Sequence, residues 1–223
     1  MNNKKIVLFT VVIFAIIVAL VLVVNNKGQD KDQEKVSLNS LENQPTLGNE
    51  DAPVTIVEFG DYKCPSCKAW GERVFPKLQE DFIDTGKAKL TYINVLFHGN
   101  ESVLAALASE SVFKQDPENF WAFHKGIYDA QPSNQNHDEE WVTTDTLVEI
   151  AKAYAPNIDF DEFKKDINEK GTLDEVMIDD KLVKDVNIQF TPTIIINGVM
   201  LDDPFDYDAI KAQIEKSLDN KNE

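Results

Sequence analysis

Two cysteines separated by two residues could carry redox chemistry in this chain. Cys64 and Cys67 are the only cysteines in the sequence, and they lie between a run typical of a strand and a run typical of a helix. A pair at this spacing can close a small disulfide that opens again reversibly. Because free N–H groups and the positive end of the helix dipole favour a thiolate, Cys64 is predicted to be the attacking sulfur and Cys67 the buried resolving thiol.

Half of a zinc site is the alternative interpretation of this spacing. A structural zinc ion needs four ligands. The sequence contains no second cysteine pair and no Cys/His pair nearby to complete them. Thiol–disulfide chemistry is therefore favoured over metal binding at this motif.

The overall charge argues against one class of partner. The 223 residues carry a formal net charge of −17, which is opposite to what a phosphate backbone attracts, so no nucleic-acid binding is expected. A chain of this length can bury a full-sized core, either as one domain or as one domain with an insertion.

The N-terminal segment predicts a membrane anchor. Residues 6–24 are apolar apart from Thr10, long enough to cross a bilayer as one helix, and no small-residue cleavage site follows them. A buried core helix would show a polar face, which this run lacks. We therefore expect residues 1–24 to be an uncleaved transmembrane signal anchor, and the polar residues 25–43 to be a flexible linker.

The lysines on the two sides of this segment do not decide its orientation. A disulfide-forming site suits an oxidising exterior. The expected location is thus the cytoplasmic membrane, crossed once, with the catalytic domain on its extracytoplasmic face.

The order of predicted elements is that of an α/β protein. A strand at 54–59 leads into the cysteine motif, a helix at about 65–83 kinked by Pro76 follows, and a second strand spans 89–97. A mostly helical stretch comes next, in which Thr172 and Glu175 form a predicted capping box. The chain then returns to a hairpin around Asn197-Gly198 and closes with a helix at about 207–218.

This order resembles a thioredoxin fold with an inserted helical domain, as in the DsbA family of disulfide oxidoreductases. The resemblance is carried by the Cys-Pro-Ser-Cys motif, by Glu58 six residues before Cys64, by the Phe-Thr-Pro-Thr loop at 190–193 and by the aromatic run at 120–124. With its single anchor, the chain is most similar to the membrane-anchored Gram-positive branch, the BdbD type. The resemblance implies a thioredoxin-like domain at 44–98 and 187–219, and an inserted helical domain at 99–186.

The resemblance also implies roles for five residues. Cys64 matches the nucleophile and Cys67 the resolving cysteine. Pro192 matches a cis-proline opposite the disulfide, where the backbone of Thr191 can pair with substrate. Glu58 matches a buried acid that accepts or donates a proton during exchange, whereas an isolated strand glutamate would more often face solvent. The motif departs from the best-studied members of the family, which carry a histidine where this chain has a serine.

A structural calcium ion is a further implication of the resemblance. Gln44, Asp179 and the carbonyl group of Leu182 stand at the matching positions, and oxygen ligands suit calcium. From the sequence alone, a solvated helix face is the better interpretation of Asp179 and Asp180. No cofactor besides the redox-active disulfide is expected.

The expected activity is donation of the Cys64–Cys67 disulfide to reduced secreted or cell-surface proteins. A quinone-linked membrane oxidase resembling DsbB would reoxidise the enzyme, which is expected to be a monomer. One alternative is a dithiol reductase or isomerase, although such isomerases usually add a dimerisation domain that residues 25–43 are too short to supply. Another alternative is a membrane-tethered, chaperone-like binding module, which would not need the cysteines.

Overall fold

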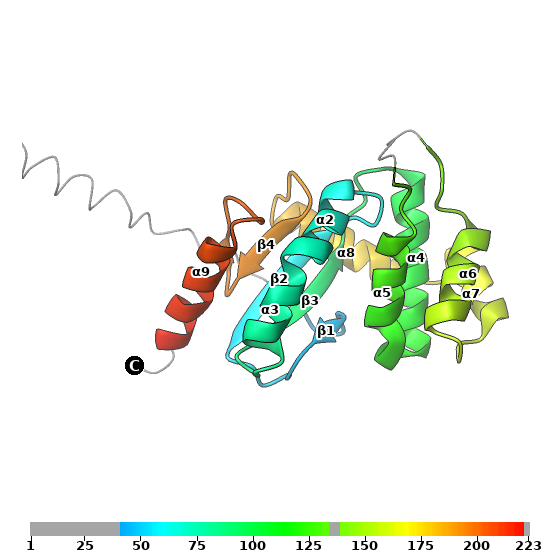
Figure 1. Ribbon diagram of the computed structural model, residues 1–223. Coiled ribbons are helices and arrows are strands. Elements are labelled where there is room, and N and C mark those ends of the chain that lie inside the picture. The colour runs from blue at the N-terminus through cyan, green and yellow to red at the C-terminus, as the bar shows by residue number, and fades with distance from the viewer. Residues whose placement is uncertain (1–40, 134–138, 221–223) are drawn as a thin grey trace, which may run out of the picture. The chain divides into compact units, whose positions relative to one another are not determined.

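One five-stranded sheet organises the residues that the computed structural model describes, 41–133 and 139–220 (Figure 1). Its spatial order is β1-β3-β2-β4-β5. The central strand β2 pairs parallel with β3 and antiparallel with β4. The strands are β1 (Thr46–Leu47), β2 (Val54–Gly60), β3 (Ala88–Asn94), β4 (Thr193–Ile196) and β5 (Val199–Met200).

The predicted hairpin is confirmed. Strands β4 and β5 are joined by Asn197 and Gly198, whose φ angles are 46° and 85°. Both angles lie in the left-handed region that Asn and Gly tolerate best, so this dipeptide favours a tight turn.

Three helical segments cover one face of the sheet. They are α2 (Pro65–Arg73), α3 (Phe75–Leu78) and α9 (Tyr207–Asp219), and a π-helical turn at Gln79–Ile83 follows α3. The prediction of one helix kinked at Pro76 is wrong in detail, because the break falls at Val74 and Pro76 lies in the first turn of α3. Proline is tolerated there because an N–H at a helix start has no partner within the helix.

Helix α8 (Leu173–Asp185) packs on the other face of the sheet, through Leu182 and Val183. The predicted capping box is wrong: Thr172 makes no side-chain cap, and its hydroxyl donates instead to the carbonyl oxygen of Leu107 at 2.8 Å. A buried acceptor on another helix has displaced the local bond.

Four further helices form an aromatic-rich core of their own. They are α4 (Asn100–Gln115), α5 (Phe120–Asp129), α6 (Thr144–Tyr154) and α7 (Phe160–Asn168), and a 3-10 turn at Pro117–Asn119 precedes α5. Thr143 and Asp159 cap α6 and α7 with side chains that accept backbone N–H bonds. Both cysteines belong to this core, so the motif lies where the sheet meets the helical segment. The proposed division at 99 and 186 stays a prediction.

The predicted anchor at 6–24 and nearly all of the linker lie outside the described residues. Within residues 41–133 and 139–220, every helix is too short or too polar to cross a membrane.

Candidate active site

The two cysteines lie at the start of α2 as a reduced pair. Cys64 is the N-cap residue and Pro65 follows it in the first turn. A turn before the helix brings the Cys64 N–H to within 2.9 Å of the Asp61 carbonyl oxygen. Cys64 is 7% exposed and Cys67 is fully buried, so the first sulfur is the one that a substrate can reach.

The environments of the two thiols push their pKa values apart. Hydrogen bonding from Cys67 lowers the pKa of Cys64 from 9.0 to about 5, with further help from Thr191 and from the amides of Cys67 and Ser66, and in spite of burial. Burial raises the pKa of Cys67 well above its ordinary value, and the charge of a Cys64 thiolate adds to this. Cys64 is thus suited to be a stable thiolate and Cys67 to remain a thiol.

Glu58 lies on the central strand β2 and faces inward. It is 2% exposed and is paired in register with Tyr92 on β3 and Ile194 on β4. Among the described residues its carboxyl group makes no hydrogen bond. Burial, and then the charge of Cys64, raise its pKa to about 8. Glu58 is therefore a protonated acid at neutral pH rather than a solvent-facing strand residue.

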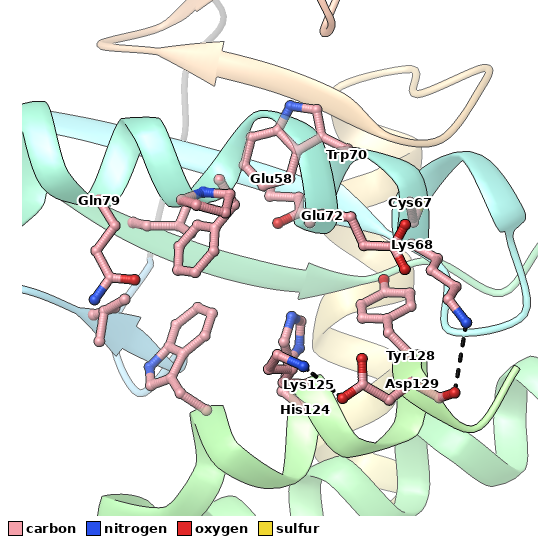
Figure 2. Close-up of a pocket in the computed structure, with 16 residues that line it drawn as sticks. Glu58, Cys67, Lys68, Trp70, Glu72, Gln79, His124, Lys125, Tyr128 and Asp129 are labelled. Carbon is pink, nitrogen blue, oxygen red and sulfur yellow. Dashed lines mark hydrogen bonds and ion pairs between the residues drawn. The ribbon is translucent and has the colours of Figure 1, made fainter.

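A cavity of about 500 Å³ reaches both Glu58 and Cys67 (Figure 2). Helices α2 and α3 line one side of it, and Trp121, His124 and Tyr128 on α5 line the other. Burial lowers the pKa of His124 to about 3, so this imidazole is neutral and adds no charge. The cavity gives the buried acid and the buried thiol a shared space.

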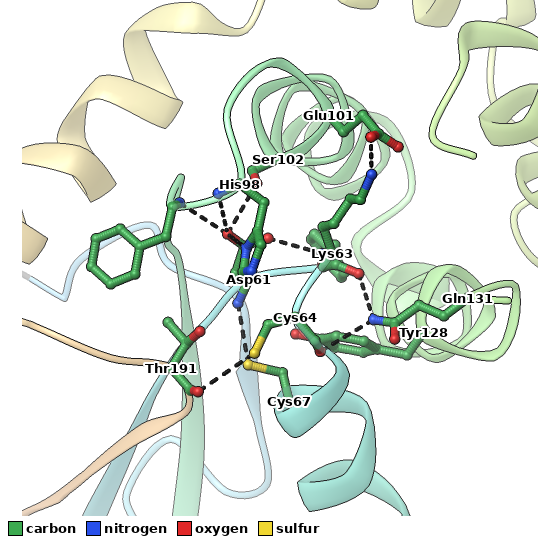
Figure 3. A network of polar contacts seen from close by, with 12 residues as sticks. Asp61, Lys63, Cys64, Cys67, His98, Glu101, Ser102, Tyr128, Gln131 and Thr191 are labelled. Carbon is green, nitrogen blue, oxygen red and sulfur yellow. Dashed lines mark hydrogen bonds and ion pairs between the residues drawn. The ribbon is translucent and has the colours of Figure 1, made fainter. Parts of the chain in front are cut away.

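The loop before β4 lies against the first cysteine. The Thr191–Pro192 peptide bond is cis, as the resemblance implies. The Cys64 thiol donates to the Thr191 carbonyl oxygen at 3.5 Å (Figure 3). Phe190, the first residue of this loop, is 48% exposed. The loop thus carries backbone polar groups and an apolar side chain beside the reactive sulfur.

Sequence reasoning missed a carboxylate at the centre of a polar network. Asp61 is fully buried. Its side chain accepts hydrogen bonds from the backbone N–H groups of Lys63, Phe97 and His98, from the His98 imidazole and from the Ser102 hydroxyl (Figure 3). Strand β3 ends at Asn94, earlier than the predicted strand end at residue 97, and the N–H groups of Phe97 and His98 beyond it donate to Asp61. The one sequence signal was an aspartate three residues before the first cysteine.

A buried ion pair lies beside this network. The Lys63 ammonium group pairs with Glu101 at the start of α4 and donates to the Glu139 carbonyl oxygen at 3.0 Å. Glu101 also accepts the backbone N–H groups of Trp141 and Val142, both at 2.9 Å. The pair ties the cysteine loop to the helical segment.

Of the predicted calcium residues, Gln44 lies just before β1, and Asp179 and Leu182 lie on α8. Asp179 is fully buried, so the solvated-face alternative is wrong for this residue. Its carboxylate accepts from the Gln44 amide at 2.8 Å and from the Asn94 amide at 2.9 Å. The Leu182 carbonyl oxygen accepts the Val186 N–H at 2.9 Å. Within the part of the chain that is described, no three His, Cys, Asp or Glu side chains are arranged as a metal site.

Known proteins resemble this chain in sequence and in fold. A family model described as thioredoxin matches residues 40–216. The chain is 45% identical over 197 residues to "Disulfide bond formation protein D" of Bacillus subtilis. The aligned region covers 88% of this chain and 87% of that protein. The chain belongs to the DsbA-like thioredoxin family.

Two solved structures extend this family assignment. The crystal structure of oxidised BdbD from Bacillus subtilis superposes with a TM-score of 0.78 at 46% identity, covering 83% of this chain and 98% of that one. The structure of Chlamydia trachomatis DsbA gives a TM-score of 0.68 at 25% identity, over 80% and 93% of the two chains. The prediction of a DsbA-like thiol-disulfide oxidoreductase with a helical insertion is confirmed, and thiol–disulfide exchange in disulfide formation is the activity of this family member.

Proposed function

We propose that the enzyme donates its Cys64–Cys67 disulfide to reduced proteins that have crossed the cytoplasmic membrane. The observation that carries the direction of transfer is the low pKa of Cys64, about 5. A thiolate stabilised in this way lowers the free energy of the dithiol form, and a stabilised dithiol makes the corresponding disulfide a stronger oxidant. A dithiol reductase would instead need a disulfide form that is stable relative to its dithiol form.

The first exchange step uses Cys64, Cys67 and Glu58. A substrate thiolate attacks the Cys64 sulfur, the Cys64–Cys67 bond breaks, and a mixed disulfide forms between substrate and Cys64. The Cys67 sulfur leaves with the electron pair. Because burial disfavours a thiolate there, Glu58, with its pKa near 8, gives Cys67 a proton. The cavity between α2 and α5 lets water return that proton to Glu58.

The second step completes the transfer of two electrons. A second substrate thiolate attacks the substrate sulfur of the mixed disulfide, and Cys64 leaves as a stable thiolate. The backbone of Thr191, beside Pro192, holds the substrate strand during both steps. The substrate then carries a disulfide and the enzyme a dithiol. A DsbB-like, quinone-linked membrane oxidase accepts those electrons and restores the enzyme disulfide.

Trapping of substrates tests these roles. We expect Cys67→Ser to accumulate mixed disulfides through Cys64, because the thiol that clears the intermediate is gone. We expect Cys64→Ser to accumulate none and to transfer no disulfide. The variants are first treated with glutathione disulfide, so that a free Cys64 carries glutathione, and are then mixed with a reduced model protein, whose thiolate displaces the glutathione and becomes linked to Cys64. The readout is non-reducing electrophoresis of these complexes. Complexes trapped through Cys67 instead would contradict the assignment.

Two alternatives remain distinguishable by experiment. Thiol trapping in cells should find the Cys64–Cys67 pair mostly as a disulfide, whereas a reductase or isomerase would be mostly dithiol. A chaperone-like module would keep its activity when both cysteines are replaced by serine, and a disulfide donor would lose it.

We further propose that the catalytic part works as a monomer outside the membrane, anchored by residues 6–24. The apolar sequence of that segment supports the anchor. Protease added to intact protoplasts should digest the chain beyond the anchor and leave an N-terminal stub in the membrane. Protection of the whole chain would contradict this topology.

A calcium ion held by Gln44 and Asp179 is a second proposal for this protein. Two observations support it: the Gln44 Oε1 and Glu175 Oε2 atoms are buried without hydrogen-bond partners among the described residues. Burial, and then the charges of Asp179 and Glu175, raise the pKa of Glu110 to about 8. A hard cation would satisfy the unpaired oxygens and relieve this repulsion. The Leu182 carbonyl group, also predicted as a ligand, would have to share the helical bond that it accepts.

Calcium titration of the full chain tests this site. We expect saturable binding by calorimetry and a rise in Tm with added calcium, both lost in Glu175→Gln. Asp180→Asn is the matched control, because Asp180 lies on the same helix in an exposed pair with Lys184. Absence of binding, or an equal loss in the control, would contradict the proposal.

A further inference from the structure

An imidazole lies beside the cysteine motif, although the motif itself carries no positive charge. His98 Nδ1 is 2.8 Å from the Asp61 carboxylate (Figure 3). Asp61 in turn touches both cysteines: its carbonyl oxygen accepts the Cys64 N–H at 2.9 Å, and its own N–H donates to the Cys67 sulfur at 3.4 Å. One residue therefore connects the imidazole to the redox pair.

Three other basic side chains near the motif are engaged elsewhere. Lys63 is paired with Glu101 and nearly buried. The Lys68 ammonium group donates to the Gln131 carbonyl oxygen at 3.3 Å, on the helical side. His124 is buried and neutral. The positive charge that a serine in the motif cannot supply thus has a candidate source in His98.

We propose that protonated His98, oriented by Asp61, is a positioning residue that stabilises the Cys64 thiolate and so strengthens the disulfide as an oxidant. This inference rests on the disulfide-donor function proposed above. His98, in the loop between β3 and α4, then supplies the positive charge that a histidine inside the motif could supply.

The charges around His98 favour its protonated form. Its hydrogen bond to Asp61 raises the pKa of the imidazole above 6.5, although partial burial opposes this, and the charges of Asp61 and of the Cys64 thiolate raise it further. Lys63 lowers it, but Glu101 pairs with that lysine. Because coupling between two sites is reciprocal, a thiolate that stabilises the imidazolium is stabilised by it to the same extent.

Substitution of His98 tests the charge separately from the hydrogen bond. His98→Asn keeps a side-chain N–H for Asp61 but removes the charge. We expect the Cys64 pKa, measured by ultraviolet absorbance of the thiolate, to rise by about 0.5 to 1, as for one nearby charge in a partly hydrated site. The equilibrium constant for reduction by glutathione should fall about 3- to 10-fold, where tenfold is about 30 mV. His98→Lys, which restores a charge, should recover part of both.

Ser102→Ala is the matched control. Its hydroxyl donates to the same Asp61 oxygen as His98, so the variant removes a bond from the network without altering any charge. It should leave the Cys64 pKa and the glutathione equilibrium unchanged. No change in His98→Asn, or an equal change in Ser102→Ala, would overturn the proposal.

A measurement on the unmodified protein gives a second test. We expect an NMR titration to give His98 a pKa about 0.5 to 1 higher in the dithiol than in the disulfide form, because only the dithiol carries the thiolate. Equal values would overturn the proposal. Such a failure is distinct from failure of the donor function, which would appear as loss of substrate trapping by Cys67→Ser.

Discussion

Two buried carboxyl groups, Asp61 and Glu58, lie three residues apart in the sequence just before the cysteine pair and differ in their surroundings. Asp61 accepts five hydrogen bonds and makes none as a donor through its side chain, which is the pattern of an ionised carboxylate. Glu58 has no such donors among the described residues, and its pKa is raised to about 8. Burial alone therefore does not determine the role of a carboxyl group. The number of hydrogen-bond donors around it distinguishes the acceptor Asp61 from the proton carrier Glu58.

The same contrast separates the two sulfurs. Hydrogen bonds from the Cys67 thiol, from Thr191 and from the backbone amides of Cys67 and Ser66 favour charge on Cys64. Burial disfavours charge on Cys67, which lines a cavity together with Tyr128 and the uncharged His124. The motif thus lies on a boundary between a polar network and an apolar core, and exchange moves charge toward the polar side.

The largest effect is expected from Asp61→Ala. Removing the carboxylate leaves several buried donors without an acceptor, so the free energy of unfolding should fall by about 5 kcal/mol. Denaturant unfolding measures it. Asp129→Ala is the control, because it removes only an exposed pair with Lys125 and should cost less than about 0.5 kcal/mol. Similar losses in Asp61→Ala and Asp129→Ala would contradict the role of Asp61 as the acceptor for several buried donors.

Glu58 should impose a pH dependence on stability. The folded protein keeps the Glu58 proton up to about pH 8, whereas the unfolded chain releases it near 4.5. The contribution of Glu58 to the free energy of unfolding is therefore complete below the unfolded pKa and declines as pH rises to about 8, by a total of about 5 kcal/mol. The disulfide form, which lacks the Cys64 charge, should show the part of this decline that burial causes, and Glu58→Gln should flatten it. An unchanged slope in the variant would contradict a buried, protonated Glu58.

The same substitution should slow exchange. Glu58→Gln keeps the shape of the side chain but cannot give Cys67 a proton, so disulfide transfer should fall about 100-fold, or about 2.7 kcal/mol in the barrier. Stopped-flow fluorescence during reduction by a model dithiol reports the rate. A rate within a factor of two of the unmodified enzyme would exclude Glu58 as the proton donor.

The smallest effect is expected on the polar side. Ser102→Ala removes one of several donors to Asp61 and should lower the unfolding free energy by about 1 kcal/mol. Unfolding in denaturant again gives the value. A loss as large as that of Asp61→Ala would contradict a network in which several donors each make one of the bonds to Asp61.

Much of the site could be predicted because each of its parts carries a short sequence pattern of its own. The cysteine motif, Glu58 on the strand before it and the Thr191-Pro192 loop each follow from a short pattern together with the family resemblance. The helices followed from their apolar periodicity, and the Asn197-Gly198 hairpin from its turn residues.

The parts that sequence reasoning missed depend on contacts between distant segments. Four of the five hydrogen bonds to the Asp61 side chain come from residues 97–102, beyond the end of β3. Thr172 gives up a local cap for a carbonyl group on α4. His98 becomes a candidate for redox tuning only because Asp61 holds it beside Cys64. No local spacing encodes any of these pairings.

The central claim is that a Cys64 thiolate stabilises the dithiol form, and unfolding of both redox forms across pH tests it most directly. With a Cys64 pKa of about 5 in the folded protein and 9.0 when unfolded, the thiolate's contribution is present above the unfolded pKa and is lost as pH falls through about 5. For the full chain in mild detergent, we compare the free energy of unfolding of the dithiol form with that of the disulfide form. The dithiol value minus the disulfide value should rise between about pH 5 and pH 9.0, by at most about 1.4 kcal/mol per pH unit. A difference that stays flat, or falls as pH rises, would contradict the account.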